Sequence, residues 1–168
     1  MNDYADFIKK FRLTEDFSAP TSLKFEDLIA APLSRKDVKA DMQAVNSSLE
    51  VIRQTRGGSW PAEAVTEEFN FLDLAWHERE FRDGDSFAYA VRNTSGVYIG
   101  CFYLYPMGLR TKLTEELLAH DVDASWWVTT ESYEQGYYRK LFKALQQWLK
   151  DFPFNNVYYS NQEVPNED

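Results

Sequence analysis

Two hydrophobic patterns follow each other in residues 121–151, and the other segments are arranged around them. In the first, apolar and polar positions alternate with the period of a strand whose faces meet different environments: Ala124, Trp126 and Val128 against Asp123, Ser125, Trp127 and Thr129. In the second, apolar residues recur at helical spacing: Leu141, Leu145, Trp148, Leu149 and Phe152. The pattern predicts a strand, a short polar turn and a long amphipathic helix, with Gly136 in its first turn.

This strand-to-helix junction has the features of an anion site. The first backbone N–H groups of a helix have no partner within it, and they point towards one place. Gly136 allows a ligand close to the backbone, and basic residues follow it: Arg139, Lys140 and Lys143. We call residues 133–139 the phosphate-binding turn, because they predict a seat for phosphate or pyrophosphate. An ordinary turn with solvated basic side chains explains the same residues.

The other segments give shorter signals in the order of the chain. Helices are predicted at Asn2–Phe11, at Arg35–Arg53 with Val38, Met42, Val45, Leu49 and Ile52 buried, and at Thr66–Phe81 with Phe69, Leu72, Trp76 and Phe81 as its apolar residues. Strands are predicted at Lys24–Ala31, Ser86–Arg92, Val97–Tyr105 and Asn156–Ser160. Residues 93–96 are turn formers and predict an antiparallel hairpin, and residues 107–120 form a linker with one or two helical turns.

This order of elements is that of an α/β fold around a mixed sheet. With 168 residues and 44% apolar content, the chain has enough material for one substantial core. We expect residues 24–168 to form a single domain. Residues 1–23 form an N-terminal arm that packs on the body or on a neighbouring molecule.

Charge and composition narrow the partners. The 18 basic and 27 acidic residues give a net charge of −9, which argues against nucleic acid and weakly favours a cationic substrate such as an amine. The single cysteine, Cys101, allows no intrachain disulfide and is expected in the core. Because the N-terminus lacks an apolar signal core and no run has the length of a membrane span, we expect no membrane association and a cytoplasmic location.

Four segments resemble the GNAT superfamily of acyl-CoA-dependent N-acyltransferases, in that family's order. They are LIAAPLSRKD (28–37), IGCFYLYP (99–106), SWWVTTE (125–131) and YEQGYYRKLFKALQQWL (133–149). The resemblance implies a GNAT-like, mostly antiparallel sheet flanked by helices, with acetyl-CoA as cosubstrate. The family's turn reads Arg or Gln, two residues, Gly, one residue, then Gly or Ala. Here Tyr133 replaces the first, Gly136 matches, and Tyr138 replaces the small residue.

The family usually continues after the last predicted strand with a helix and two more strands, whereas only residues 161–168 follow here. We therefore expect a fold that lacks the last helix and strand pair. The open sheet edge would be covered by the arm or by a second subunit in a homodimer. The tyrosine that often protonates the departing thiolate from that region would be replaced or absent.

The resemblance also implies where the chemistry takes place. An amine attacks a thioester held where strand 122–130 and the last strand separate, with the thioester carbonyl against a backbone N–H near Trp127 or Val128. The implied cofactor contacts are Trp127, Val128, Thr129, Tyr133, Gln135, Gly136, Tyr138 and Arg139. Glu131 and Asp123 are candidate general bases and Tyr159 a candidate acid. The alternative for either carboxylate is a solvated cap at a strand end, which is the more common role of such a residue.

Histidines and tryptophans leave further alternatives open. His77 forms a surface hydrogen bond or lines an acceptor pocket, and His120 with Asp121 and Asp123 is too sparse for a metal, so no metal is expected. Trp60, Trp76, Trp126 and Trp127 wall an apolar acceptor pocket or pack in the core. The function predicted is acetyl transfer from acetyl-CoA to an amine of unknown identity. The alternatives are an inactive GNAT-fold module that binds CoA or another ligand, and a protein-interaction module.

Overall fold

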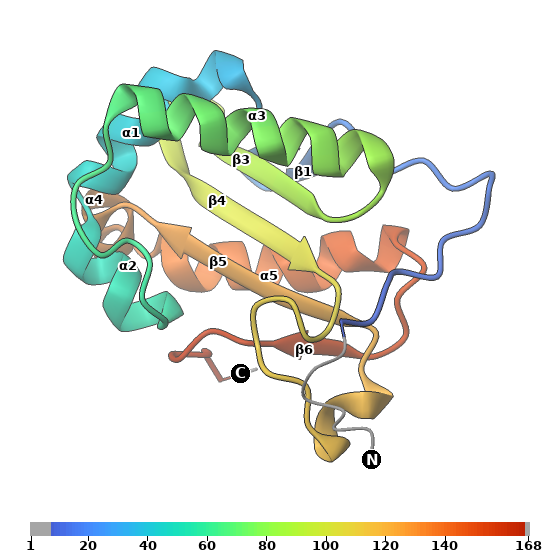
Figure 1. The fold of residues 1–168 in the computed structure, drawn as a ribbon. Helices are drawn as coiled ribbons and strands as arrows, with labels where there is room; N and C mark the ends of the chain where they lie inside the picture. Colours follow the sequence, from blue (N-terminus) through green and yellow to red (C-terminus); the bar gives the residue numbers. More distant parts are fainter. Residues whose placement is uncertain (1–7, 167–168) are drawn as a thin grey trace.

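A curled six-stranded sheet organises residues 8–166, the part of the chain that the computed structural model describes (Figure 1). The strands lie in sequence order: β1 (Leu23–Phe25), β2 (Leu28–Pro32), β3 (Phe87–Asn93), β4 (Tyr98–Tyr105), β5 (Val122–Val128) and β6 (Val157–Tyr159). Every neighbouring pair is antiparallel except β5 and β6, which run parallel. The predicted mixed, mostly antiparallel α/β fold is confirmed.

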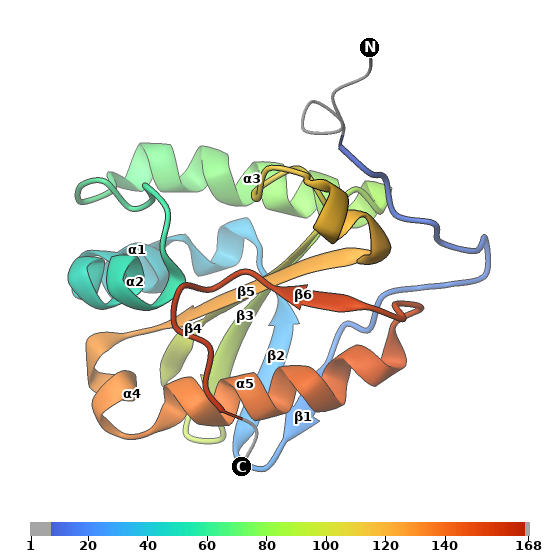
Figure 2. The ribbon, with the colours of Figure 1, turned by 90° about the horizontal axis from the view of Figure 1, so that it is seen from below.

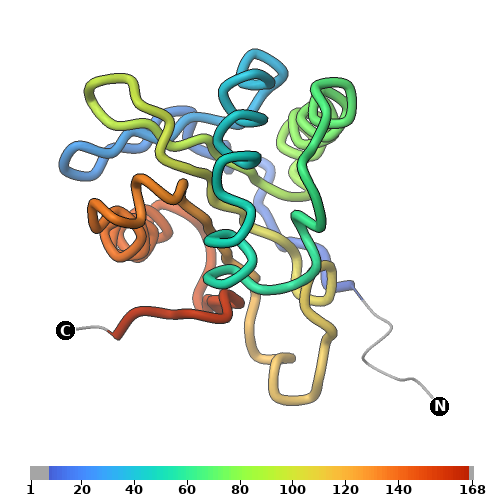
Figure 3. The backbone as a smooth tube through the Cα atoms, turned by 90° about the vertical axis from the view of Figure 1, so that its left-hand side faces the viewer, coloured from blue at the N-terminus to red at the C-terminus, as the bar shows by residue number. Residues whose placement is uncertain are grey.

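Helices cover both faces of this sheet (Figure 2). One face carries α1 (Val38–Asn46), α2 (Leu49–Arg56) and α3 (Glu67–Asp83), and the other carries α5 (Tyr137–Trp148). The short α4 (Thr130–Glu134) joins β5 to α5, and 3-10 turns lie at Arg35–Asp37, Glu115–Ala119 and Leu149–Asp151. Figure 3, which looks along α3 and α5, shows the two helices on opposite sides of the strands. No described helix has the length and apolar character needed to cross a membrane.

The two faces form two separate hydrophobic cores, and β5 contributes to both. Ala124, Trp126 and Val128 pack with α5, whereas Trp127 packs with α1 and α3. The predicted alternation of β5 is therefore confirmed. The predicted stripe of the long helix is also buried in the first core: Leu141, Leu145, Trp148, Leu149 and Phe152.

The segment Lys24–Ala31 is a hairpin of β1 and β2, so the prediction of a single strand was wrong. Phe25 pairs with Leu28, which leaves only Glu26 and Asp27 in the turn. Such a turn needs a positive φ, usually at Gly or Asn, and here Glu26 has φ 51°. The turn is held by Tyr137 and Lys140 of α5, which donate hydrogen bonds to Asp27. Because the turn depends on these tertiary contacts, the local sequence does not indicate it.

The predicted helix Arg35–Arg53 is interrupted at Ser47 and Ser48. Ser47 Oγ donates to the carbonyl of Ala44 at 3.1 Å, and Ser48 Oγ accepts the backbone N–H of Thr130 at 2.9 Å. Serine side chains compete with helical hydrogen bonds in this way. The break therefore ties the α1–α2 junction to the end of β5, where α4 begins.

The apolar residues named for the predicted helix Thr66–Phe81 mostly face solvent in α3. Phe69, Leu72 and Trp76 are 58%, 61% and 57% exposed, and the helix buries Asn70, Leu74 and His77 instead. Asn70 is accommodated because its amide donates to the carbonyl of Val38 and to the carboxylate of Asp41. A buried polar residue with two partners thus stands on the buried face of α3, where an apolar residue would be expected.

Most of the predicted helix Asn2–Phe11 lies outside the described residues, and Ile8–Phe11 are not helical. This part of the arm contacts the body of the protein. The N–H of Lys9 donates to the carbonyl of Met107 at 2.8 Å, and Phe11 stacks on Phe87 with ring centroids 5.7 Å apart.

A buried hydrogen-bond network lies in the second core. Asp41 accepts from Tyr98 Oη at 2.6 Å and from Asn70 Nδ2 at 3.1 Å, and Cys101 Sγ lies 3.4 Å from the same carboxylate. Cys101 is fully buried, as expected. Burial raises the pKa of Asp41, while the hydrogen bonds from Tyr98 and Asn70 oppose that shift.

This raised pKa predicts a pH-dependent stability. A carboxyl whose pKa is raised by folding stabilises the folded state below its unfolded pKa of 3.8, and that contribution is lost as the pH rises through the folded value. Replacing Asp41 by Asn removes the ionisation. The melting temperature of Asp41→Asn minus that of the wild type should therefore increase as the pH rises from 3.8, by up to about 3 °C per pH unit until the pH passes the folded pKa of Asp41.

Thermal melts between pH 4 and 8 measure this difference, and Asp16→Asn, which alters an exposed carboxyl, is the control. A difference for Asp41→Asn that stays constant over the whole range would contradict the assignment.

Candidate active site

The parallel strands β5 and β6 separate after a short ladder. They pair from Val122 with Val157 to Ala124 with Tyr159, and the last backbone hydrogen bond joins Ser160 N to Ala124 O at 3.0 Å. Beyond it no backbone hydrogen bond joins the two strands among the described residues, which agrees with the separation that the resemblance implied. A gap of this kind exposes backbone donors of the inner strand to a ligand.

The first groups of β5 beyond that ladder are already bonded. Asn161 Oδ1 accepts the N–H of Trp126 at 3.0 Å, and Asn161 Nδ2 donates to the carbonyl of Trp126 at 2.9 Å. Backbone groups of alternate residues point to the same side of a strand, so the N–H of Val128 also faces this gap, whereas that of Trp127 faces β4. Of the two oxyanion donors predicted, the geometry therefore retains Val128 and rules out Trp127.

Gly100 on β4 makes a close contact with this part of β5. A Cβ built on Gly100 would lie 1.9 Å from the carbonyl oxygen of Trp127 and 2.8 Å from the Cα of Val128. Only glycine allows the two backbones to approach so closely. Gly100 thus sets the path of β5 where Val128 faces the gap.

Gly136 lies between α4 and α5 with φ 85°, so α4 replaces the polar turn expected from the sequence. A Cβ on Gly136 would meet no atom within 4 Å. The N–H groups of Gln135 and Gly136 donate to carbonyls of α4, so the unpaired donors of the turn begin with the first residues of α5. The phosphate-binding turn is therefore open to solvent and lies at the N-terminus of a 12-residue helix.

Tyr138 points inwards from the phosphate-binding turn. It is 5% exposed, and its ring lies 5.0 Å from that of Trp126. Its hydroxyl donates to the carbonyl of Glu163, lies 3.3 Å from the carbonyl oxygen of Thr55, and accepts from Asn161 Nδ2 at 2.8 Å. Burial raises the pKa of Tyr138, so the hydroxyl stays protonated. The Tyr138 ring leaves the space above Gly136 free and fills the space between α5 and the gap.

The C-terminal segment, residues 161–166, lies over this region. Gln162 N and Glu163 N donate to the carbonyls of Arg56 and Thr55 at the end of α2, and the carbonyl of Asn166 accepts from Arg139 at 2.9 Å. Figure 2 shows the segment running from β6 past α2 and then across α5. It therefore covers the route from the phosphate-binding turn to the gap.

The remaining predicted cofactor contacts line the same region. Thr129 caps α4, with Oγ1 accepting from Ser132 N at 3.1 Å. The Tyr133 hydroxyl donates to Glu163 at 3.4 Å, and Gln135 is exposed at the end of α4.

The three predicted catalytic residues do not converge. Asp123, at the start of β5, is fully buried, and neither of its carboxylate oxygens has a hydrogen-bond partner among the described residues. Glu131 is exposed beyond the other end of β5, about 20 Å away at roughly 3.3 Å per residue. Tyr159 packs on Phe142 of α5, on the opposite face of the sheet from Asp123. Of the three, only Asp123 faces the α3 side of the sheet, within the β5–β6 ladder and next to the gap.

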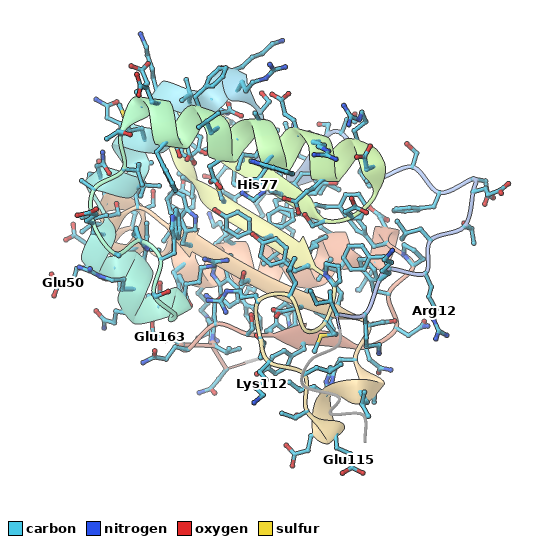
Figure 4. The ribbon with its side chains drawn as sticks, in the orientation of Figure 1. Arg12, Glu50, His77, Lys112, Glu115 and Glu163 are labelled. Atoms are coloured by element: carbon cyan, nitrogen blue, oxygen red, sulfur yellow. The ribbon has the colours of Figure 1, made fainter. Side chains whose placement is uncertain are left out.

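A cleft of about 520 Å³ opens on that side, and we refer to it below as the cleft. Its lining comes from the end of α2, from α3, from β4 and from the loop that follows β4: Arg56, Gly57, Gly58, Ser59, Trp60, Asp73, His77, Glu80, Tyr103, Tyr105, Leu109 and Arg110. His77 belongs to the buried face of α3 and contacts Asp73 at 3.6 Å (Figure 4). Of the two alternatives for His77, the structure supports lining of a pocket.

Two arginines of the cleft were missed by the sequence analysis. The Arg56 guanidinium lies 4.6 Å from the Tyr103 ring centre, and its Nε donates to Ser125 at 3.2 Å. Arg110 donates to Ser160 and to the carbonyls of Arg56 and Gly57. Burial and the charge of Arg56 lower the pKa of Arg110. The sequence shows Arg56 only as the last residue before a glycine pair, and nothing local connects it to Arg110.

The phosphate-binding turn fits the pyrophosphate of acetyl-CoA. The space above Gly136 is open, the helix N-terminus favours an anion, and Arg139 lies beside it. The route beyond does not fit a pantetheine arm while Asn161 holds both backbone groups of Trp126. The arm can follow that route only if residues 161–166 move.

These features define a class of protein: a mixed α/β fold with diverging parallel strands beside a helix N-terminus. The family model for the GNAT acetyltransferase domain matches residues 27–163, and the chain therefore belongs to the GNAT family. A comparison with curated protein sequences finds no significant match.

Solved structures support the same fold. The structure titled as a ribosomal L7/L12 α-N-protein acetyltransferase in complex with coenzyme A has 14% identity and a TM-score of 0.57, and the match covers 78% of this chain and 66% of that one. The ribosomal-protein-S5-alanine acetyltransferase of Vibrio fischeri has 14% identity and a TM-score of 0.57, covering 77% and 67%. A spermidine N-acetyltransferase mutant from Vibrio cholerae has 15% identity and a TM-score of 0.51, covering 80% and 70%. The chain thus spans about two thirds of the length of these proteins.

Proposed function

We propose that the protein is an N-acetyltransferase that uses acetyl-CoA and an amine acceptor. The observation that carries the proposal is membership of the GNAT family over residues 27–163, combined with an open helix N-terminus at Gly136 beside diverging strands. The first residues of α5 and Arg139 would hold the pyrophosphate. The N–H of Val128 would face the thioester carbonyl, which places a fixed dipole where negative charge develops in acyl transfer.

We assign the general base to Asp123 among the predicted carboxylates. It faces the cleft side of β5, and burial without partners leaves its oxygens able to accept a proton from an amine. Glu131 lies at the far end of the strand, and Tyr159 faces α5, so both become weaker candidates. The predicted cytoplasmic location and homodimer stay predictions.

The second candidate function is a GNAT-fold module that binds a ligand without catalysis. The placement of Tyr138 and Asn161 favours it, because their hydrogen bonds hold residues 161–166 over the route to the gap. In this alternative the phosphate-binding turn holds the cofactor's anionic end and the acyl group never reaches Val128.

Two measurements separate these functions. Calorimetric titration with acetyl-CoA should show binding for both functions. Titration with acetate, the control, should give no heat of binding. Release of free CoA in the presence of an amine panel should occur only for the transferase, and Asp123→Asn should reduce that release by roughly 10²-fold or more while CoA still binds. Absence of binding would exclude both functions. Binding without release for any amine would leave the binding module.

A further inference from the structure

Arg56 is a buried cation without a counterion. The residue is 7% exposed, and only its Nε donates to a described residue, Ser125. Its side chain lines the cleft, and none of the ion pairs among the described residues involves Arg56. A guanidinium carries its donors in a planar fork that matches a carboxylate. The free side of that fork is available to a ligand in the cleft.

Arg110 places a second positive charge beside the first. It also forms no ion pair with a described residue, and its three hydrogen bonds go to the hydroxyl of Ser160 and the carbonyls of Arg56 and Gly57. Part of its role is structural, because it caps the C-terminal carbonyls of α2. Two like charges held together away from water are unfavourable unless an anion compensates them.

No carboxylate of a described residue forms an ion pair with either arginine. Asp73 contacts His77 at 3.6 Å, and Glu80 accepts from the hydroxyl of Ser86 at 2.6 Å. The charge of the buried Asp123 partly opposes the lowering of the Arg110 pKa, but Asp123 forms no ion pair with Arg110. In a chain with a net charge of −9, a cationic pair left unpaired in a cleft points to an anion supplied from outside.

The arginine pair lies where the cleft meets the diverging strands. Arg56 donates to Ser125 on β5, and Arg110 donates to Ser160 directly after β6. The N–H of Ser160 forms the last rung of the β5–β6 ladder with Ala124. A ligand held by the two guanidinium groups therefore lies next to the gap into which the acetyl group would be brought.

We propose that the cleft is the acceptor site and that it selects an amino-acid-sized amine carrying a carboxylate, which binds to Arg56 and Arg110. The proposal rests on the proposed acetyl transfer and adds the acceptor class. The cleft volume of about 520 Å³ suits a molecule of this size, and Trp60, Tyr103 and Tyr105 supply aromatic walls for its carbon chain. The neighbouring guanidinium charges also favour the neutral, nucleophilic form of a nearby amine.

The test compares two probes of equal length, 4-aminobutyrate and n-butylamine, by calorimetry in the absence of acetyl-CoA. Wild-type protein should bind 4-aminobutyrate at least about tenfold more tightly, because charge-assisted bidentate hydrogen bonds are the stronger class. Arg56→Gln should bring the ratio close to one. Arg53→Gln is the matched control, since Arg53 lies one turn earlier on α2 and, within residues 8–166, its side chain donates only to the carbonyl of Ala62.

Arg56→Lys is a second variant, which tests the proposal if Arg56→Gln does not fold. It keeps the positive charge but loses the fork, so the preference for 4-aminobutyrate should fall several-fold. Equal binding of the two probes by wild-type protein, or a preference that survives both Arg56 variants, would overturn the proposal.

Failure of the inference and failure of the proposed function give different results. Acetylation of n-butylamine at the same rate as 4-aminobutyrate would keep the transferase and refute the acceptor class. A carboxylate preference in binding without any acetyl transfer would keep the anion site and refute the transferase. Two tripeptide amides, one with Asp and one with Asn at position two, form a further pair of probes. If the carboxylate preference were found only between these two peptides, the amino-acid size of the acceptor would be refuted and the cleft would be assigned to peptide termini.

Discussion

Replacing Gly136 by Glu is expected to weaken binding of acetyl-CoA by about 100-fold or more. The new side chain begins in open space at the N-terminus of α5, where no atom lies within 4 Å of its Cβ. Its carboxylate then occupies the region where the pyrophosphate is proposed to bind. Two unit charges of the same sign about 4 Å apart near a protein surface repel by about 4 kcal/mol, which exceeds the 2.7 kcal/mol that corresponds to a 100-fold change.

Gly96→Glu is a closely matched control for this experiment. Gly96 has φ 84° against 85° for Gly136, and a Cβ there also meets nothing within 4 Å. Both variants therefore carry the same backbone strain, about 1–2 kcal/mol for an L-residue in the left-handed region. Titration of both variants with CoA shows whether a loss of affinity comes from the added charge at the phosphate-binding turn or from a general loss of stability. Equal affinities in the two variants would show that the cofactor binds elsewhere.

The second large effect is expected on stability, from Gly100→Ala. The added methyl group would lie 1.9 Å from the carbonyl oxygen of Trp127, so β4 and β5 must move apart by about 1 Å or more to reach the 3.0 Å that real contacts require. Both strands carry fully buried aromatic residues, and such interiors do not absorb displacement without loss of packing. We expect the free energy of unfolding to fall by about 3 kcal/mol or more.

Urea denaturation measures this loss, and Gly96→Ala is the control because it introduces strain without a clash. Its loss should be about 1 kcal/mol. If the two alanine variants lost equal stability, the close approach of β4 and β5 at Gly100 would be refuted. If the Gly100→Ala protein folds, its rate of acetyl transfer from acetyl-CoA should also be lower, since the same contact positions the N–H of Val128.

The elements that local periodicity encodes were predicted from the sequence. In β5 and α5 each residue's environment follows from its place in a period of two or 3.6, so the strand, the helix and their buried positions could be read directly. The β1–β2 hairpin depends on tertiary hydrogen bonds to Asp27, and the α1–α2 break depends on a hydrogen bond from the backbone N–H of Thr130 to Ser48 Oγ. Such features need partners distant in sequence, which a single chain's pattern does not reveal.

The candidate site divides in the same way. Gly136 could be found because a glycine after a strand and before a helix is a local signal. Asn161 meets Trp126 across 35 positions, and Arg56 meets Ser125 across 69, so neither contact leaves a local trace. For His77 and Trp60 the sequence left a pocket wall open beside a surface or core role, and both line the cleft. Trp76 was assigned to a pocket wall or the core, and it is exposed.

The carbonyl of Arg56 accepts two hydrogen bonds, one from Gln162 of the C-terminal segment and one from Arg110 in the cleft. Lifting the segment away from α2 removes the first of these and so changes the electrostatic surroundings of the second. Thermodynamic linkage requires that such an influence be mutual. Binding of one ligand in the cleft and binding of another at the phosphate-binding turn should therefore alter each other's affinity by an equal factor. The end of α2 would couple the two sites.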